Sequence, residues 1–217
     1  MSEFARRRTI KVDTQVRPSD VTKFPIIEDM LTVPRELFVP NALQEAAYAG
    51  ENLEIARGRT ILDPRTLAKI LEVVNIQPTD LVLDVACGMG YSSAVAAHLA
   101  EAVIALEDNP DLCAEAEIAL ANAGADNVAV VEGPLEAGAA KHGPFDVILI
   151  QGAVETVPDA LTDQLKDGGR IAAIFEDGRL GTVRVGLKAD GVMSWRSAFN
   201  ADAPVVSSFR KEAEFSL

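Results

Sequence analysis

The residues with the clearest chemical potential lie in one short segment that runs from Leu81 to Gly90. An apolar run carries Asp84 near its end, and Gly88 and Gly90 follow just before a segment that can begin a helix. Glycine permits positive φ angles and removes side chains that would block a ligand, while a helix start offers free backbone N–H groups. Glu107 ends the next apolar run, where a carboxylate can accept hydrogen bonds from both hydroxyls of a ribose. Order and spacing together predict a nucleoside-binding site, although each feature alone also fits an ordinary turn or a solvated strand end.

Two classes of nucleoside cofactor compete for this site, a dinucleotide and S-adenosylmethionine. The dinucleotide fingerprint needs a third glycine where this chain has Ser93, and position 86, two residues before Gly88, is Ala86. Asp84 has a use in the second class, because its carboxylate can hold the ammonium group of a methionine moiety directly or through water. Glu107 serves in both classes. These features favour S-adenosylmethionine over a nicotinamide cofactor.

The segment from Leu81 to Gly90 lies within a series of predicted strands and helices that alternate from about Pro78 onward. Strands are predicted over Leu81–Val85, Val103–Leu106, Val128–Val131, Val147–Ile150, Arg170–Phe175, Thr182–Leu187 and Val192–Phe199, with a candidate final strand near Phe209–Phe215. The helices predicted between them are Ser92–Ala100, Pro110–Ala123 and Pro158–Leu165, the last ending at a glycine turn in 166–169. This pattern predicts an α/β fold with a doubly wound, mostly parallel, Rossmann-like sheet and an antiparallel C-terminal edge.

A proline-punctuated N-terminal third precedes this core. We expect residues 1–77 to form a helical extension on the substrate side and residues 78–217 to form the cofactor-binding core, within one globular unit. Short helices are predicted over Pro25–Leu31 and Asn41–Ala49. An amphipathic helix follows Asp63, which is its natural N-cap.

Composition narrows the classes of partner. The net charge of −13 opposes binding to nucleic-acid backbones, and the basic cluster Arg6–Arg8 is interpreted as part of a solvated tail. No apolar run is long enough to span a membrane, so a cytoplasmic protein is predicted. Cys87, Cys113, His98 and His142 lack the spacing of metal ligands, and the two cysteines cannot build a disulfide framework, so no metal site is assigned.

Further segments share an order and spacing that point to one family. They are Val33-Pro-Arg-Glu-Leu-Phe-Val-Pro40, Ala47-Tyr48, Gly58-Arg-Thr60-Ile61, Pro144-Phe-Asp-Val-Ile-Leu-Ile150 and Leu161-x-x-Gln-Leu-x-x-Gly-Gly-Arg170. With the glycine-rich segment, they resemble the protein-L-isoaspartate O-methyltransferases over nearly the whole chain.

The resemblance implies a cofactor, an acceptor and a set of site residues. The cofactor would be S-adenosylmethionine, and the acceptor would be an isoaspartyl residue of a protein or peptide. Thr60 would be the catalytic candidate, with Ile61 and Leu62 in the wall of the acceptor site. The cofactor would contact Asp84, Ala86, Cys87, Gly88, Gly90, Glu107, Gly133 and Leu135.

Two departures from the family pattern bear on activity. Leu62 stands where the family has a serine whose hydroxyl faces the acceptor, and Gly133-Pro134-Leu135 stands where the family has Gly-Asp-Gly, whose carboxylate contacts adenine. Each lost contact is expected to cost about 1–3 kcal/mol. Two alternatives therefore remain open beside isoaspartyl methylation: a different acceptor, including a small molecule, or a cofactor-binding protein without turnover. The oligomeric state is not predicted.

Overall fold

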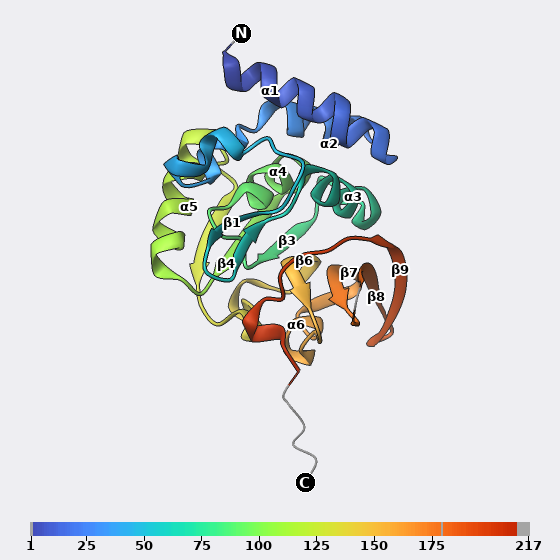
Figure 1. Cartoon of the computed structure of the whole chain (residues 1–217). Coiled ribbons are helices and arrows are strands. Elements are labelled where there is room, and N and C mark those ends of the chain that lie inside the picture. The colour runs from blue at the N-terminus through green and yellow to red at the C-terminus, as the bar shows by residue number, and fades with distance from the viewer. Residues whose placement is uncertain (1, 179, 212–217) are drawn as a thin grey trace.

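The predicted Rossmann-like sheet is present, with seven strands in the order β5-β4-β3-β6-β7-β8-β9 (Figure 1). The structure, a computed structural model, describes residues 2–178 and 180–211. The strands are β3 (Leu81–Val85), β4 (Ala102–Glu107), β5 (Val128–Glu132), β6 (Phe145–Val154), β7 (Leu165–Glu176), β8 (Gly181–Ala189) and β9 (Val192–Asn200). Strands β3 to β7 pair in parallel, and β8 and β9 add the antiparallel edge that the sequence predicted.

Helices cover both faces of this sheet. Helices α3 (Pro64–Val74), α4 (Tyr91–Leu99) and α5 (Pro110–Ala123) bury their apolar residues in one core, whereas α6 (Asp159–Thr162) contributes Leu161 to the core on the opposite face. The local signals act as expected: the side chain of Asp63 accepts a 2.9 Å hydrogen bond from the backbone N–H of Thr66 at the start of α3. Shorter 3-10 turns are Arg17–Ser19, Arg35–Phe38, Asn41–Ala46, Leu135–Ala137, Ala140–His142 and Ser207–Phe209.

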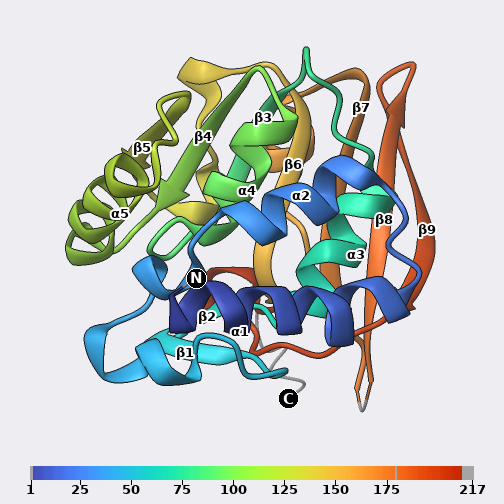
Figure 2. The same cartoon turned by 90° about the horizontal axis from the view of Figure 1, so that it is seen from above.

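The first part of the N-terminal extension, residues 2–32, lies as an outer layer over α3 and α4 (Figure 2). It consists of α1 (Glu3–Lys11), a π-helical turn over Val12–Val16 and α2 (Phe24–Thr32), which confirms the predicted helix there. Val12 and Met30 belong to the same buried apolar cluster as residues of the sheet. These N-terminal helices therefore share a core with the sheet.

The interpretation of Arg6–Arg8 as a solvated tail was wrong. These residues lie within α1, and Nη2 of Arg8 is 3.1 Å from a carboxylate oxygen of Glu36. Ser2 caps the helix by accepting a hydrogen bond from the backbone of Ala5, and Glu3 pairs with Arg6 one turn later. Local capping and charge pairing thus stabilise a helix where a solvated tail was expected.

Two predicted helices are shorter than expected. The segment Asn41–Ala49 forms a 3-10 turn over Asn41–Ala46 only, and the helix predicted over Pro158–Leu165 ends at Thr162. The second shortening has a clear cause, because Leu165 is buried and pairs with Phe145 as the first residue of β7. The glycine turn at 166–169 is consequently a bulge within β7 and not a helix end.

The candidate final strand near Phe209–Phe215 lies partly outside the described residues. Within them, Phe209 closes a 3-10 turn and Lys211 is in no regular element, so this part of the prediction was wrong. The buried Phe209 ring packs into the core beside α6. None of the helices in residues 2–178 and 180–211 is long and apolar enough to cross a membrane. The cytoplasmic location stays a prediction.

A small hairpin was not predicted. Strands β1 (Leu53–Ala56) and β2 (Arg59–Ile61) pair antiparallel and form a separate two-stranded sheet. Gly58 makes the tight connection possible with a φ of 73°. The hairpin lies in front of the carboxyl ends of the central strands (Figure 1), and β2 contacts β6.

Candidate active site

The glycine-rich loop links β3 to α4 through alternate left-handed residues. Ala86, Gly88 and Gly90 have φ angles of 60°, 58° and 89°. A Cβ at Gly88 would lie 2.7 Å from Cδ1 of Ile55 in the hairpin, so a side chain there would require Ile55 to move. Gly90 occupies the N-cap position of α4. The loop therefore turns tightly enough to present its backbone at the carboxyl end of the sheet.

Asp84 lies buried at the base of this loop. Its carboxylate accepts three hydrogen bonds of 2.6 Å, from the hydroxyls of Ser92 and Ser93 and from the side-chain amide of Gln151. Burial raises the pKa of the carboxyl, and these hydrogen bonds oppose that shift. Ser93, which breaks the dinucleotide fingerprint, thus fixes the carboxylate of Asp84 between α4 and β6. The contact of Asp84 with a methionine moiety stays a prediction.

Glu107 ends β4 directly beside the loop. Its carboxylate accepts hydrogen bonds from the backbone N–H groups of Gly88 (2.9 Å), Asp108 (3.0 Å) and Asn109 (3.2 Å). The residue is 0% exposed. Burial raises the pKa of Glu107, and the neighbouring guanidinium of Arg59 opposes this shift. The predicted ribose acid is therefore held in a fixed position at the carboxyl end of β4, beside the loop that follows β3.

Arg59 is a site residue that the sequence reasoning missed. Its Nε lies 2.8 and 3.0 Å from the two carboxylate oxygens of Glu107, and Nη2 bonds Asp108. The side chain is 6% exposed, whereas Arg57 at the tip of the same hairpin is exposed. Arg57 lies in the turn and Arg59 in β2, a difference that the sequence could have indicated only if the hairpin had been predicted first.

The residues predicted to wall the acceptor site lie next to the loop. Thr60 and Ile61 end β2, Leu62 follows, and all three are buried. Together they border a cavity of about 10 Å³, whose other lining residues are Leu67, Cys87, Tyr91, Ser92 and Gln151. A cavity of this size holds about one water molecule. The structure thus brings the predicted acceptor wall and the predicted cofactor loop to one place, in a closed arrangement.

Arg35 explains part of the N-terminal motif. Its guanidinium donates to the backbone carbonyls of Ala47 at 2.7 Å and Leu62 at 2.9 Å, and it lies 4.8 Å from the ring centre of Tyr91. The side chain is completely buried, and burial lowers its pKa. Arg35 therefore holds the backbone of the acceptor wall against α4. No sequence signal short of the motif itself indicated this role.

Gly133 and Leu135 lie on the far side of Glu107. The N–H of Gly133 donates to the carbonyl of Glu107 at 2.9 Å, so this segment continues the edge of the sheet. The side chain of Leu135 is fully buried, in the same core as Leu161 of α6. Contact of these two residues with adenine stays a prediction.

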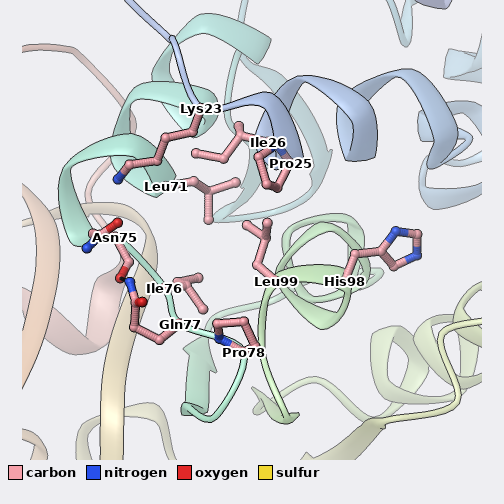
Figure 3. Close-up of a pocket in the computed structure, with 10 residues that line it drawn as sticks. All are labelled: Lys23, Pro25, Ile26, Leu71, Asn75, Ile76, Gln77, Pro78, His98 and Leu99. Atoms are coloured by element: carbon pink, nitrogen blue, oxygen red, sulfur yellow. Dashed lines mark hydrogen bonds between the residues drawn. The ribbon is translucent and has the colours of Figure 1, made fainter.

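A larger cavity lies elsewhere in the molecule. It measures about 390 Å³ and is bordered by α2, by the turn between α3 and β3, and by the end of α4 (Figure 3). The glycine-rich loop follows the carboxyl end of β3, whereas the turn that borders this cavity precedes the amino end of β3. The predicted site and the cavity therefore lie at opposite ends of the strands. No residue of the predicted site lines this cavity.

The chemistry of the loop residues fits S-adenosylmethionine. A rigid carboxylate at Glu107 suits a ribose diol, and left-handed glycines allow close approach of a ligand to the backbone. The same carboxylate is engaged by Arg59 in this structure, at 2.8 Å from its Nε.

Fold and site together define a Rossmann-like, S-adenosylmethionine-dependent methyltransferase. The sequence model of the protein-L-isoaspartate(D-aspartate) O-methyltransferase family matches residues 12–198. A protein-L-isoaspartate O-methyltransferase of Koribacter versatilis is 39% identical over 171 residues, which are 79% of this chain and 77% of that protein. The chain belongs to this family, and it is an O-methyltransferase, as the sequence resemblance implied.

Solved structures agree on the fold. A protein-L-isoaspartate O-methyltransferase matches with a TM-score of 0.78 and 23% identity over 91% of this chain and 65% of its own length. A Plasmodium falciparum protein named for the same activity, in complex with S-adenosyl-L-homocysteine, gives a TM-score of 0.78 and 18% identity over 96% and 100%. The match with the Plasmodium falciparum protein, which spans 96% of this chain, covers the N-terminal extension as well as the sheet.

Proposed function

We propose that the protein transfers a methyl group from S-adenosylmethionine to the carboxylate of an isoaspartyl residue in a protein or peptide. The observation that carries this proposal is the shared cavity between Thr60, Ile61 and Leu62 on one side and Cys87 of the loop on the other. An acceptor bound against the first set lies beside a cofactor bound along the second. Family membership supplies the class of acceptor.

The chemistry needs little from the side chains. S-adenosylmethionine supplies an electrophilic methyl group on a sulfonium. The acceptor carboxylate has an ordinary pKa of about 4 and is already ionised at neutral pH, so no general base is required. Holding the reacting atoms in line can contribute roughly 7–11 kcal/mol. A rigid site without a catalytic dyad is consistent with that demand.

Each residue of the site has a proposed task. Glu107 binds the ribose, Asp84 and the backbone of Ala86, Cys87, Gly88 and Gly90 surround the methionine end, and Gly133 and Leu135 border the adenine. Thr60 and Ile61 orient the acceptor. Arg35 keeps that wall in place through the carbonyl of Leu62.

The experiment uses the full chain, S-adenosylmethionine labelled in its methyl group, and two peptides that differ only in an isoaspartyl or an aspartyl residue. We expect base-labile label in the isoaspartyl peptide well above the aspartyl control. Equal labelling of the two peptides would contradict the proposal.

A different acceptor is the second candidate, and Leu62 favours it. This side chain is 1% exposed and offers no hydroxyl where the family places one. An apolar wall suits an acceptor whose neighbouring groups are apolar, including a small molecule. Labelled products from fractionated extract, in the absence of isoaspartyl labelling, would support this candidate.

A further inference from the structure

The hairpin β1–β2 covers the proposed cofactor site. Ile55 of β1 fills the space that the missing side chain of Gly88 leaves free. Arg59 of β2 engages the Glu107 carboxylate with its Nε and Asp108 with its Nη2. The hairpin therefore contacts both parts of the site, the glycine-rich loop and the ribose acid.

This contact closes the ribose acid to any ligand. Glu107 has no exposed surface, and its guanidinium partner occupies the same oxygens that a ribose diol would need. A vicinal diol can donate to both oxygens of a carboxylate, and the Nε–H of Arg59 already lies within hydrogen-bond distance of both oxygens of Glu107, so the two compete for one position. Binding of a nucleoside therefore requires Arg59 to leave.

The surrounding groups allow that departure. Without Arg59, the carboxylate of Glu107 keeps three backbone N–H donors, from Gly88, Asp108 and Asn109. The guanidinium keeps Asp108, whose side chain is 38% exposed and faces solvent. Neither charge is left buried without a partner, which would otherwise oppose opening.

We propose that the hairpin β1–β2 is a gate over the cofactor site and that Arg59 is its latch, released when a nucleoside diol takes its place on Glu107. This inference rests on the proposed function, because it takes Glu107 as the ribose acid. The same hairpin carries Thr60 and Ile61, so its opening moves the acceptor wall together with the latch. Cofactor entry and access to the acceptor site are then one motion.

The latch lowers the apparent affinity for the cofactor. When only a fraction of molecules is open, the apparent Kd equals the intrinsic Kd divided by that fraction. Replacing Arg59 by a neutral residue raises the open fraction without removing any group that contacts the nucleoside. The expected result is tighter binding, which is the opposite of what loss of a ligand residue produces.

The test compares Arg59→Gln with its matched control Arg57→Gln, an exposed arginine of the same hairpin. Calorimetric titration with S-adenosylhomocysteine is expected to give a Kd about tenfold lower for Arg59→Gln and an unchanged Kd for Arg57→Gln. Hydrogen exchange without ligand is expected to be faster at residues 53–61 in Arg59→Gln only. A Kd for Arg59→Gln equal to or higher than that of the wild type would overturn the proposal.

Two further arms separate the possible failures. Should Arg59→Gln not fold, Arg59→Lys keeps the positive charge but loses the guanidinium that bonds Glu107 and Asp108 together, and it is expected to lower the Kd by a smaller factor. An unchanged Kd would then count against the latch. If the wild type and all variants failed to bind S-adenosylhomocysteine, the proposed function would fall. The exchange rates at residues 53–61 would still decide the latch, since equal rates in Arg59→Gln and the wild type contradict it.

Discussion

The side-chain amide of Gln151 donates a 2.6 Å hydrogen bond to Oδ1 of Asp84, which ties β6 to β3 beneath the glycine-rich loop. The hydroxyls of Ser92 and Ser93 donate to the other oxygen, so both carboxylate oxygens have at least one donor. The carboxylate is nevertheless fully buried, and its pKa is raised. This combination makes Asp84 a pH-dependent element of stability.

The raised pKa predicts how the stability contribution of Asp84 varies with pH. A folded-state pKa above the unfolded value of about 3.9 means that the folded protein binds more protons between the two values, so stability from this group falls as pH rises through them. Asp84→Asn removes this dependence. The free energy of unfolding of the variant, relative to the wild type, is expected to improve from about pH 4 toward neutrality, by about 1.4 kcal/mol for each unit of pKa difference. Urea unfolding at several pH values measures it, and a relative stability that worsens with pH would contradict the assignment.

Ser93→Ala tests the support of the same carboxylate. The change removes one donor from a buried acceptor, and we expect a loss of about 1–3 kcal/mol in the free energy of unfolding at neutral pH. Ser194→Ala, at an exposed position of β9, is the matched control and is expected to change stability by less than about 0.5 kcal/mol. Equal effects of the two substitutions would show that the Ser93 hydroxyl does not stabilise Asp84.

Arg35→Lys tests the clamp behind the acceptor wall. A lysine lacks the planar guanidinium whose Nε and Nη2 bond the carbonyls of Ala47 and Leu62 beside the Tyr91 ring, so we expect a loss of about 2–4 kcal/mol in stability. Under conditions where the variant is folded, KM for the acceptor is expected to rise more than Kd for S-adenosylhomocysteine. Arg65→Lys, on the exposed face of α3, serves as control. Wild-type stability of Arg35→Lys would show that the guanidinium of Arg35 does not hold this wall in place.

Leu62→Ser restores the hydroxyl that the family carries. We expect isoaspartyl methylation per folded molecule to rise by one to two powers of ten, because an orienting hydrogen bond contributes about 1–3 kcal/mol in the transition state. The side chain is buried, so the same change is expected to cost about 2–4 kcal/mol of stability. Steady-state kinetics on protein confirmed as folded by circular dichroism separates the two effects. No gain in isoaspartyl turnover would favour a different acceptor.

The central sheet could be predicted because its signals are local. Apolar runs such as Leu81–Val85 and the cap at Asp63 determine their own structure, and the structure confirms them. Helix α1 has a local cap at Ser2, but its place in the fold and that of the hairpin β1–β2 depend on contacts between distant segments, such as Arg8 with Glu36. No periodicity in a nine-residue polar segment or in a three-residue strand reveals those contacts.

Some residues of the candidate site could likewise be predicted from the sequence, and others could not. Asp84, Gly88 and Glu107 were found from spacing along the chain, because a strand, a tight turn and the next strand follow one another in sequence. Arg59 reaches Glu107 across 48 residues, and only the fold brings them together. The closed state of the site is likewise a property of the hairpin and not of the loop.

A crystal structure of the full chain with S-adenosylhomocysteine tests the central claim most directly. We expect both ribose hydroxyls on the carboxylate of Glu107, with the guanidinium of Arg59 withdrawn toward Asp108 and the backbone of Gly88 against the ligand. A ligand bound in the cavity between α2, α3 and α4, or a ribose that leaves the Arg59–Glu107 pair intact, would contradict the account.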